Sequence, residues 1–335
     1  MDTLSDIAEA LVAPKKGILA ADESLPTIEK RFTSIGIEST EENRRAYREM
    51  LFTTDGIEAF ISGVIMFDET LYHKTSDGTS FPALLQSRGI IPGIKVDEGT
   101  EAMMDSSEEK VTKGLEGLPP RMPKYYADGA RFSKWRAVIT IGKGIPTDAC
   151  INENAKRLSA YARLSQQHGL VPVIEPEVLM DGDHTIDQCQ DATSATLRAV
   201  FAATKEKGVE HRGLLLKTNM VLSGKACPIQ ANLDEVAQKT VQTLTETVPG
   251  DIGGIVFLSG GQDDILATQR LNGIERLGPH PWQVSFSYSR ALLGPALAAW
   301  GGKAENVAAA QAAFYKRARL NSEARNGTYT TEMEK

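Results

Sequence analysis

A lysine at the end of an apolar run is the residue of this chain best suited to covalent chemistry. Lys217 directly follows residues 214–216, three leucines in a segment with the composition of a buried strand. Desolvating an ammonium group is costly, so a lysine held in apolar surroundings tends to lose its proton. The neutral amine is a nucleophile that can form a Schiff base with a carbonyl group. The alternative is a lysine that ends its strand and extends its ammonium group to water.

Two glutamates stand two residues apart after another apolar run. If the strand continues, Glu175 and Glu177 point to one face of it. A buried pair of carboxylates raises the pKa of one member, which suits general acid–base catalysis. Pro176 between them favours an end of the strand at this point. Separate salt bridges with lysine and arginine explain the pair equally well.

A second cation and a third carboxylate complete this set. Lys134 begins another apolar run, where its charge would lower the pKa of Lys217. Asp22 follows the apolar residues 18–21 and could balance that charge or move a proton. Each such residue alone is more typical of a structural salt bridge. Their combination at the ends of different runs predicts a catalytic site.

Two further groups of residues could bind phosphate. Ser259, Gly260 and Gly261 follow an apolar run, and glycines allow backbone N–H groups to approach an anion closely. Such a triplet alone is usually a turn, but Arg290 follows the next run and can hold a phosphate through two parallel hydrogen bonds. A second phosphate could bind to two other basic residues at the ends of runs, Lys95 and Arg136.

Eight short apolar runs, separated by helical segments, could position these side chains. They cover residues 17–22, 63–67, 92–97, 135–141, 170–175, 214–218, 253–259 and 282–289. Most are apolar on both faces, which is typical of parallel strands covered by helices. Their number favours one α/β domain over residues 1–335, a closed (β/α)8 TIM barrel, over an open doubly wound sheet. In such a barrel the site lies at the carboxyl ends of the strands.

Helical patterns fill the gaps and extend the chain at both ends. Helices are predicted over residues 1–16, 152–168, 185–207, 234–247 and 304–325. Ser39 and Glu42 have the spacing of a capping box. Residues 98–129, which include Asp105, have the polar composition of a solvated insertion, and residues 328–335 are predicted to be a short mobile tail.

Composition excludes several classes of partner. The net charge is −7 and no stretch is strongly basic, which argues against nucleic acid and anionic membranes as partners. No run reaches the length of a membrane span, and the acidic first residues do not resemble a signal peptide. The three cysteines are widely spaced and the five histidines form no zinc-binding pattern. We therefore expect a cytoplasmic protein with free thiols and no metal.

Several motifs in order resemble those of one family, the class I, Schiff-base-forming fructose-bisphosphate aldolases. They are GILAADES at 17–24, TEENRR at 40–45, GIKVD at 93–97, KWR at 134–136, EPE at 175–177, DGDH at 181–184, LKTNMV at 216–221, FLSGG at 257–261 and FSYSRAL at 286–292. Each motif alone has modest specificity. Together they cover nearly the whole chain and are highly specific.

The resemblance implies reversible aldol cleavage of fructose 1,6-bisphosphate to dihydroxyacetone phosphate and glyceraldehyde 3-phosphate. It implies no cofactor, because a lysine of the chain forms the Schiff base. Lys217 matches the Schiff-base lysine, Glu175 the acid–base group for dehydration, and Asp22 the group that helps to remove the C4 hydroxyl proton. Lys134 and Glu177 match supporting charged residues. One phosphate site would comprise Ser259, Gly260, Gly261, Ser289 and Arg290, and the other Lys95, Arg136, Ser24 and Thr27. The family also implies a homo-oligomer, expected to be a tetramer.

The chain departs from the animal members of this family at several positions. Thr218 replaces a proline, Ser289 replaces a glycine in the FSYGR motif, and Leu25-Pro26 stands where threonine and glycine are common. Animal members continue further and end in a tyrosine that aids proton transfer at C3, whereas this sequence ends at Lys335 and Tyr329 matches an earlier tyrosine. We expect a group on the barrel rim to act in its place, or a slower exchange at that step.

Three alternatives remain at this level. The same mechanism could act on sedoheptulose 1,7-bisphosphate. The barrel could serve as a scaffold that has kept its site only by ancestry, although a scaffold does not need several interior lysines. A metal-dependent aldolase is disfavoured because the histidines are not clustered.

Overall fold

Eight parallel strands close into a barrel over the part of the chain that the computed structural model describes, residues 2–104 and 106–335. Around the barrel their order is β1-β10-β9-β8-β7-β6-β3-β2, so the connections between successive barrel strands run in one direction. The strands are β1 Gly17–Ala21, β2 Ile61–Met66, β3 Ile91–Lys95, β6 Phe132–Ile139, β7 Val171–Val178, β8 Leu215–Thr218, β9 Gly254–Phe257 and β10 Val284–Tyr288. The predicted (β/α)8 barrel is confirmed, and each predicted apolar run overlaps one of these strands.

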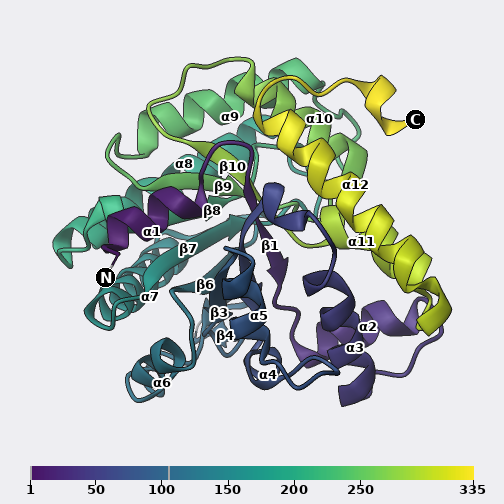
Figure 1. Ribbon diagram of the computed structural model, residues 1–335. Coiled ribbons are helices and arrows are strands. Elements are labelled where there is room, and N and C mark those ends of the chain that lie inside the picture. The colour runs from purple at the N-terminus through teal and green to yellow at the C-terminus, as the bar shows by residue number, and fades with distance from the viewer. Residues whose placement is uncertain (1, 105) are drawn as a thin grey trace.

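Helices surround the barrel and extra helices lie at both ends of the chain (Figure 1). The α-helices are α1 Leu4–Leu11, α2 Leu25–Thr33, α3 Glu41–Phe52, α4 Asp68–Tyr72, α5 Phe81–Ser87, α6 Arg121–Ala127, α7 Asp148–Gln167, α8 Ile186–Glu206, α9 Leu233–Thr247, α10 Asp264–Glu275, α11 Arg290–Trp300 and α12 Val307–Arg325. Short 3-10 helices are η1 Ile57–Ala59, η2 His211–Gly213, η3 Ala304–Asn306 and η4 Thr331–Glu334. Helix α12 packs against α10 and α11 on the outside of the barrel.

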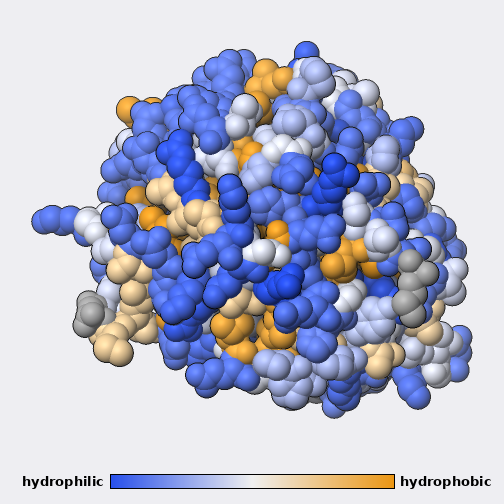
Figure 2. All heavy atoms as spheres, turned by 90° about the vertical axis from the view of Figure 1, so that its left-hand side faces the viewer, coloured by the Kyte–Doolittle hydropathy of each residue, from blue (hydrophilic) through white to orange (hydrophobic). Residues whose placement is uncertain are grey.

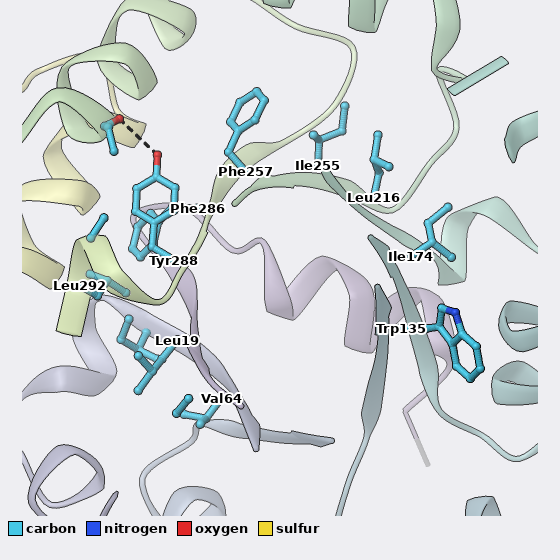
Figure 3. Packing of buried hydrophobic residues seen from close by; sticks show 14 of the residues in the cluster. Leu19, Val64, Trp135, Ile174, Leu216, Ile255, Phe257, Phe286, Tyr288 and Leu292 are labelled. Atoms are coloured by element: carbon cyan, nitrogen blue, oxygen red, sulfur yellow. Dashed lines mark hydrogen bonds between the residues drawn. The ribbon is translucent and has the colours of Figure 1, made fainter. Parts of the chain in front are cut away.

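Most of the apolar core lies between the barrel and its helices. Side chains such as Val64, Trp135, Ile174 and Leu216 point outward from their strands into this layer (Figure 3). Trp135 stacks on Tyr161 of α7 with ring centroids 5.5 Å apart. Because neighbouring residues of a strand point to opposite faces, the residues between these point into the barrel.

The amino-terminal end of the barrel interior is filled by apolar side chains. Phe132 lies so close to β3 that a Cβ on Gly93 would be 2.2 Å from its ring. Helix α1 covers this end and contributes Leu11 and Val12 to the same cluster as Phe132. A Cβ on Gly63 would be 2.6 Å from Leu11, which shows how tightly α1 is seated. Helix α1 therefore closes the end of the barrel that lies opposite to the carboxyl ends of the strands.

The segment between β3 and β6 is an ordered insertion and not simply a solvated one. It contains a hairpin of β4 Thr100–Met103 and β5 Ser106–Thr112, followed by α6. Leu118 and Met122 are fully buried, which contradicts the prediction from its polar composition. Asp105, which that prediction included, lies outside the described residues.

Two further predictions from local sequence can be compared with the structure. The N-cap of α3 is Thr40, whose side chain accepts from the Asn43 amide, so the predicted Ser39 cap is wrong. In the tail, Tyr329 is buried and donates its hydroxyl to Glu334, which also pairs with Arg317 of α12 at 2.7 Å. These contacts favour a docked tail over a mobile one.

Figure 2 shows one face of the molecular surface, coloured by hydropathy. Hydrophilic residues predominate there, and apolar ones occur in small separate groups. Among residues 2–104 and 106–335, no helix has the length and apolar character needed to span a membrane.

Candidate active site

The barrel interior changes from apolar to charged toward the carboxyl ends of its strands. On β8, Leu215 belongs to the apolar interior, and Lys217 follows it on the same face. On β7, Val173 is followed in the same way by Glu175 and Glu177. These charged ends line one cavity of about 840 Å³. The predicted common face of the two glutamates is confirmed, because β7 continues through Pro176 to Val178 and does not end there.

Four side chains form a connected ionic group at the base of this cavity. Lys134 Nζ lies 2.7 Å from Asp22 Oδ2 and 3.2 Å from Glu175 Oε2. Lys217 Nζ lies 3.2 Å from the other oxygen of that glutamate, Glu175 Oε1. Both lysine side chains are only 4% exposed. Glu175 therefore bridges two buried amines that come from different strands.

The charges in this group support one another electrostatically. Burial opposes the charge on Asp22, but Lys134 and Lys217 outweigh it and hold the pKa of Asp22 well below its ordinary value. For Glu175 as well, burial is outweighed by Lys134, Lys217 and Arg136, and the pKa is lowered. Burial is likewise outweighed at Lys134, where Asp22 and Glu175 raise the pKa. Asp22, Glu175 and Lys134 are thus charged at neutral pH.

This result corrects one expectation and refines another. A raised pKa was expected for one of two paired glutamates, but that of Glu175 is lowered because its nearest charged neighbours are cations. Lys134 is not a free second cation beside Lys217, since two carboxylates already neutralise it. Glu177 does not share this group but pairs separately with Arg136, as the salt-bridge alternative predicted.

The residues predicted for the second phosphate also line this cavity. Lys95 Nζ is 2.6 Å from Asp97 Oδ1, and Asp97 also accepts from the backbone amide of Arg136. Ser24 and Thr27, at the start of α2, contact each other through their hydroxyl oxygens at 3.1 Å. Lys95, Arg136, Ser24 and Thr27 all line the same cavity, together with Pro26. The structure thus brings this predicted set together.

The glycine turn after β9 lies beside Arg290. Ser259, Gly260 and Arg290 line the cavity, whereas Gly261 lies next to it. Gly260 and Gly261 have φ values of +58° and +89°, a region that favours glycine. A Cβ on Gly261 would also lie 2.7 Å from Arg290 Nη2. The turn therefore needs its glycines for backbone conformation and for space around the guanidinium group.

Ser289 takes part in an ion-pair network that the sequence did not reveal. Its hydroxyl oxygen accepts from Arg31 Nη2 at 3.1 Å and lies 3.4 Å from Glu23 Oε1. Glu23 in turn pairs with Arg31 and with the buried Arg48. Glu23, Arg31 and Ser289 line the cavity beside Arg290. The serine that departs from the animal motif thus links β10 to α2 across the cavity wall.

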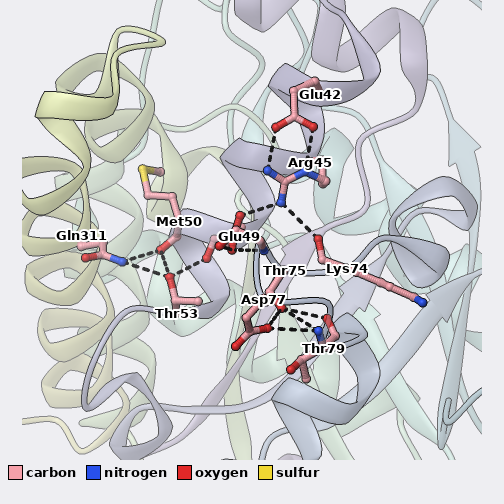
Figure 4. Close-up of polar contacts among 11 residues, drawn as sticks. Glu42, Arg45, Glu49, Met50, Thr53, Lys74, Thr75, Asp77, Thr79 and Gln311 are labelled. Atoms are coloured by element: carbon pink, nitrogen blue, oxygen red, sulfur yellow. Dashed lines mark hydrogen bonds and ion pairs between the residues drawn. The ribbon is translucent and has the colours of Figure 1, made fainter.

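Helix α3, which carries Arg48, is held in place by polar contacts on its outer side (Figure 4). Arg45 pairs with Glu42 and Glu49 at 2.6 Å each and donates to the Lys74 carbonyl. On the side that faces α12, Gln311 donates to the Met50 carbonyl and to the hydroxyl of Thr53, the C-cap of α3. These contacts fix the position from which Arg48 reaches Glu23.

Every predicted site residue except Gly261 lines the cavity, and the structure adds further charged and polar residues to them. The added residues are Glu23, Lys30, Arg31, Asp68, Asp97, Glu98, Thr100, Arg121 and Ser287. Glu23 and Asp97 stand within motifs already singled out, directly after Asp22 and two residues after Lys95. Arg31 gave no signal of its own, because it lies on the polar side of an amphipathic helix.

Fold and site together define a (β/α)8-barrel protein with a buried amine between carboxylates and basic groups on two walls. The sequence model for class-I fructose-bisphosphate aldolases matches residues 3–335. A probable class 1 enzyme of Xanthomonas campestris pv. campestris is 52% identical over 330 residues, covering 98% of this chain and 99% of its own. Fructose-bisphosphate aldolase B of Gallus gallus is 50% identical, covering 98% and 91%.

A solved structure agrees with these relatives. Fructose-bisphosphate aldolase from Plasmodium falciparum, in complex with TRAP and a small-molecule inhibitor, superposes with a TM-score of 0.96 and 49% identity, covering 98% of this chain and 95% of that one. The chain belongs to the class-I fructose-bisphosphate aldolase family. Members of this family are lyases that act through a Schiff base and use no metal. Neither the longer sugar nor a scaffold role is favoured by these comparisons.

Proposed function

We propose that this chain cleaves fructose 1,6-bisphosphate reversibly to dihydroxyacetone phosphate and glyceraldehyde 3-phosphate, with Lys217 as the Schiff-base residue. The observation that carries the proposal is the position of Lys217, whose amine is buried at the end of β8 and lies 3.2 Å from Glu175 Oε1. A buried amine needs a nearby base to become a nucleophile, and an ionised Glu175 is that base.

The first half of the reaction forms the imine. Glu175 takes a proton from the ammonium group of Lys217, and the neutral amine attacks the C2 carbonyl carbon of the open-chain sugar. The C2 oxygen then takes a second proton from the attacking nitrogen and becomes a hydroxyl. The now protonated Glu175 then gives its proton to the departing C2 hydroxyl, which leaves as water. The lowered pKa of Glu175 supports this order, because the carboxylate is ionised before substrate arrives.

The second half breaks the carbon–carbon bond. Asp22 accepts the proton of the C4 hydroxyl, the C3–C4 bond breaks, and its electron pair moves into the protonated imine to form an enamine. The aldehyde departs, C3 is protonated, and water releases the ketone from Lys217. Lys134 holds Asp22 at 2.7 Å and keeps this carboxylate ionised and ready to accept.

The walls of the cavity would hold the two phosphates. We assign one phosphate to Ser259, Gly260, Gly261, Ser289 and Arg290, and the other to Lys95, Arg136, Ser24 and Thr27. Arg136 is also the partner of Glu177, so this glutamate supports the second wall. Binding at both ends aligns the sugar with Lys217 and contributes to catalysis through orientation.

Reduction with borohydride in the presence of dihydroxyacetone phosphate tests the proposal. We expect a stable adduct on Lys217 in the peptide map, no adduct in Lys217→Met, and loss of cleavage in that variant. Activity should persist after treatment with a strong chelator. An adduct on another lysine would overturn the assignment.

We further propose a single domain over residues 1–335 that forms a cytoplasmic homo-oligomer, expected to be a tetramer. The seating of α1 in the barrel and of α12 on its outer helices supports one domain. Family membership alone supports the oligomer, and light scattering would measure it. Limited proteolysis that releases a stable fragment would contradict the single domain.

A further inference from the structure

Lys225 lies beside the glycine turn of the candidate phosphate site, in the segment that follows β8. A Cβ on Gly261 would lie 3.1 Å from Lys225 Nζ and 2.7 Å from Arg290 Nη2. Two cations from different loops therefore converge over one glycine. The oxygens of a single phosphate accept charge-assisted hydrogen bonds at about 2.7–2.9 Å, so one phosphate can span both nitrogens.

The backbone of Lys225 is fixed by the neighbouring loop. Its amide donates to the Met180 carbonyl at 2.8 Å, and the Gly224 amide donates to the His184 carbonyl at 2.8 Å. A Cβ on Gly224 would lie 2.4 Å from the Gly182 carbonyl oxygen, so the two loops approach this closely only because that residue is glycine. The backbone position of Lys225 beside the glycine turn is thus determined by the fold.

The side chain of Lys225 has a partner that it can exchange. Its ammonium group lies 2.8 Å from Asp181 Oδ1, and the two side chains are 43% and 66% exposed. An exposed pair of this kind contributes little to stability. A phosphate dianion carries more charge than a carboxylate and offers more acceptor oxygens, so it can compete with Asp181 for the lysine.

The surroundings favour such an exchange because they are rich in positive charge. Arg31 lies close enough to Arg290 to act, after burial, as the next largest cause that lowers the pKa of Arg290. Adding a dianion beside these groups relieves repulsion among them. Lys225 would be the second basic residue at this phosphate, beside Arg290.

We propose that Lys225 is a specificity-determining residue that leaves Asp181 and binds the substrate phosphate held by Arg290 and the Ser259–Gly261 turn. Asp181 acts in this scheme as an internal competitor that holds the lysine while the site is empty. The inference rests on the proposed function, since it concerns the phosphate of the same substrate. Its alternative is a surface ion pair that only ties two loops together.

The two explanations of the Lys225–Asp181 pair predict opposite effects of Asp181→Asn on the affinity for phosphate. We would measure KM and kcat for fructose 1,6-bisphosphate, and the inhibition constant of inorganic phosphate, in full-length variants. Lys225→Met should raise both KM and the phosphate inhibition constant by about three- to tenfold, which corresponds to about 0.6–1.4 kcal/mol for the lost contact, with kcat changed less than twofold. Lys225→Arg should restore most of the lost affinity.

Asp181→Asn supplies the decisive comparison. If Asp181 competes with phosphate, this variant should lower the inhibition constant of inorganic phosphate by about two- to threefold, because the exposed pair that must be broken is weak. The same change in the Lys225→Met background should have no effect. A matched control is Lys143→Met, which removes a charge from another exposed loop after a barrel strand and should leave the constant unchanged.

Two outcomes would overturn the inference. One is an unchanged phosphate inhibition constant in Lys225→Met, and the other is weaker binding in both single variants, which is the result of a purely structural tie. Melting temperatures identify any variant that fails to fold. If the wild-type chain forms no adduct on Lys217, the proposed function fails by itself, whereas binding of inorganic phosphate measured by calorimetry still reports on Lys225.

Discussion

Glu175 Oε1 lies 3.2 Å from Lys217 Nζ, at the ends of two adjacent strands of the barrel. The other oxygen of Glu175 faces Lys134 at the same distance. One carboxylate can therefore exchange protons with the reacting amine while a second lysine fixes its orientation. The consequences of this arrangement can be measured.

Glu175→Gln removes the proton acceptor and keeps the shape of the side chain. We expect kcat to fall by about 10²- to 10⁴-fold, the usual contribution of general acid–base catalysis. The rate of borohydride-trapped adduct formation should fall in parallel, whereas the affinity for inorganic phosphate should stay within twofold. An adduct rate equal to that of the wild type would show that another group handles this proton.

Lys134→Met should change both stability and the pH profile. Removing one member of a buried ionic group costs about 3–5 kcal/mol, because Asp22 and Glu175 lose their shared cation. The pKa of Glu175 is lowered in the wild type, so its ionised form persists into acid. Without Lys134 this pKa rises, and the acid limb of kcat/KM should move to higher pH.

A second substitution separates these two effects. In Lys134→Met, the further change Asp22→Asn removes one uncompensated charge and should restore part of the melting temperature but none of the activity. An acid limb that stays in place in Lys134→Met would contradict the electrostatic role of this lysine.

Ser289→Gly restores the residue found in the animal motif and removes a contact to Arg31. Because that hydroxyl accepts from Arg31 Nη2 at 3.1 Å, its loss leaves the guanidinium group with Glu23 as its remaining partner and should loosen its position on the cavity wall. We expect KM for fructose 1,6-bisphosphate to rise about two- to tenfold with kcat nearly unchanged, the effect of one hydrogen bond of about 0.5–1.5 kcal/mol. Ser289→Ala should behave alike, and no change in either variant would exclude this role.

Glu275 on α10 should make stability depend on pH. Burial raises the pKa of Glu275 to about 7, although Arg325 lowers it in part. The folded state therefore holds this proton more tightly than the unfolded state. Its contribution to the free energy of unfolding is lost as the pH rises from the ordinary pKa of a glutamate through about 7. The melting temperature should fall over this range, with about 3 kcal/mol as an upper limit from the shift.

Glu275→Gln is the control for this dependence. The amide carries no charge at any pH, so the variant should be more stable than the wild type at pH 8 and should lose this component of the slope between pH 5 and 8. A slope that is unchanged in Glu275→Gln would assign the dependence to other groups.

The barrel could be predicted because its strands are apolar on both faces and its helices have clear ends. Errors arose where local signals depended on tertiary contacts. The polar segment after β3 forms a hairpin and a helix whose few apolar residues, such as Leu118 and Met122, are buried against the barrel. Pro176 does not end β7, since the strand continues to Val178 despite losing one donor.

The sequence indicated which residues line the site but not which of them form ion pairs with one another. Reading the ends of the strands identified Lys217, Glu175 and Asp22, because charges after apolar runs are rare. Which cation neutralises which carboxylate depends on distances across the barrel, and these decide that the pKa of Glu175 is lowered. Arg31 and Lys225 were missed because an arginine on a helix and a lysine in a polar loop are common surface residues.

Helix α1 covers the amino-terminal end of the barrel with Leu11 and Val12, so, within the described residues, the cavity is reached from the carboxyl ends of the strands. Substrate and both products would therefore use the same end of the barrel. The fragment that carries the aldehyde has no covalent tether and is free to depart at once. In the proposed mechanism the ketone fragment stays bound to Lys217 until water reaches the imine, so the covalent bond sets the order of release and water must enter from the same end.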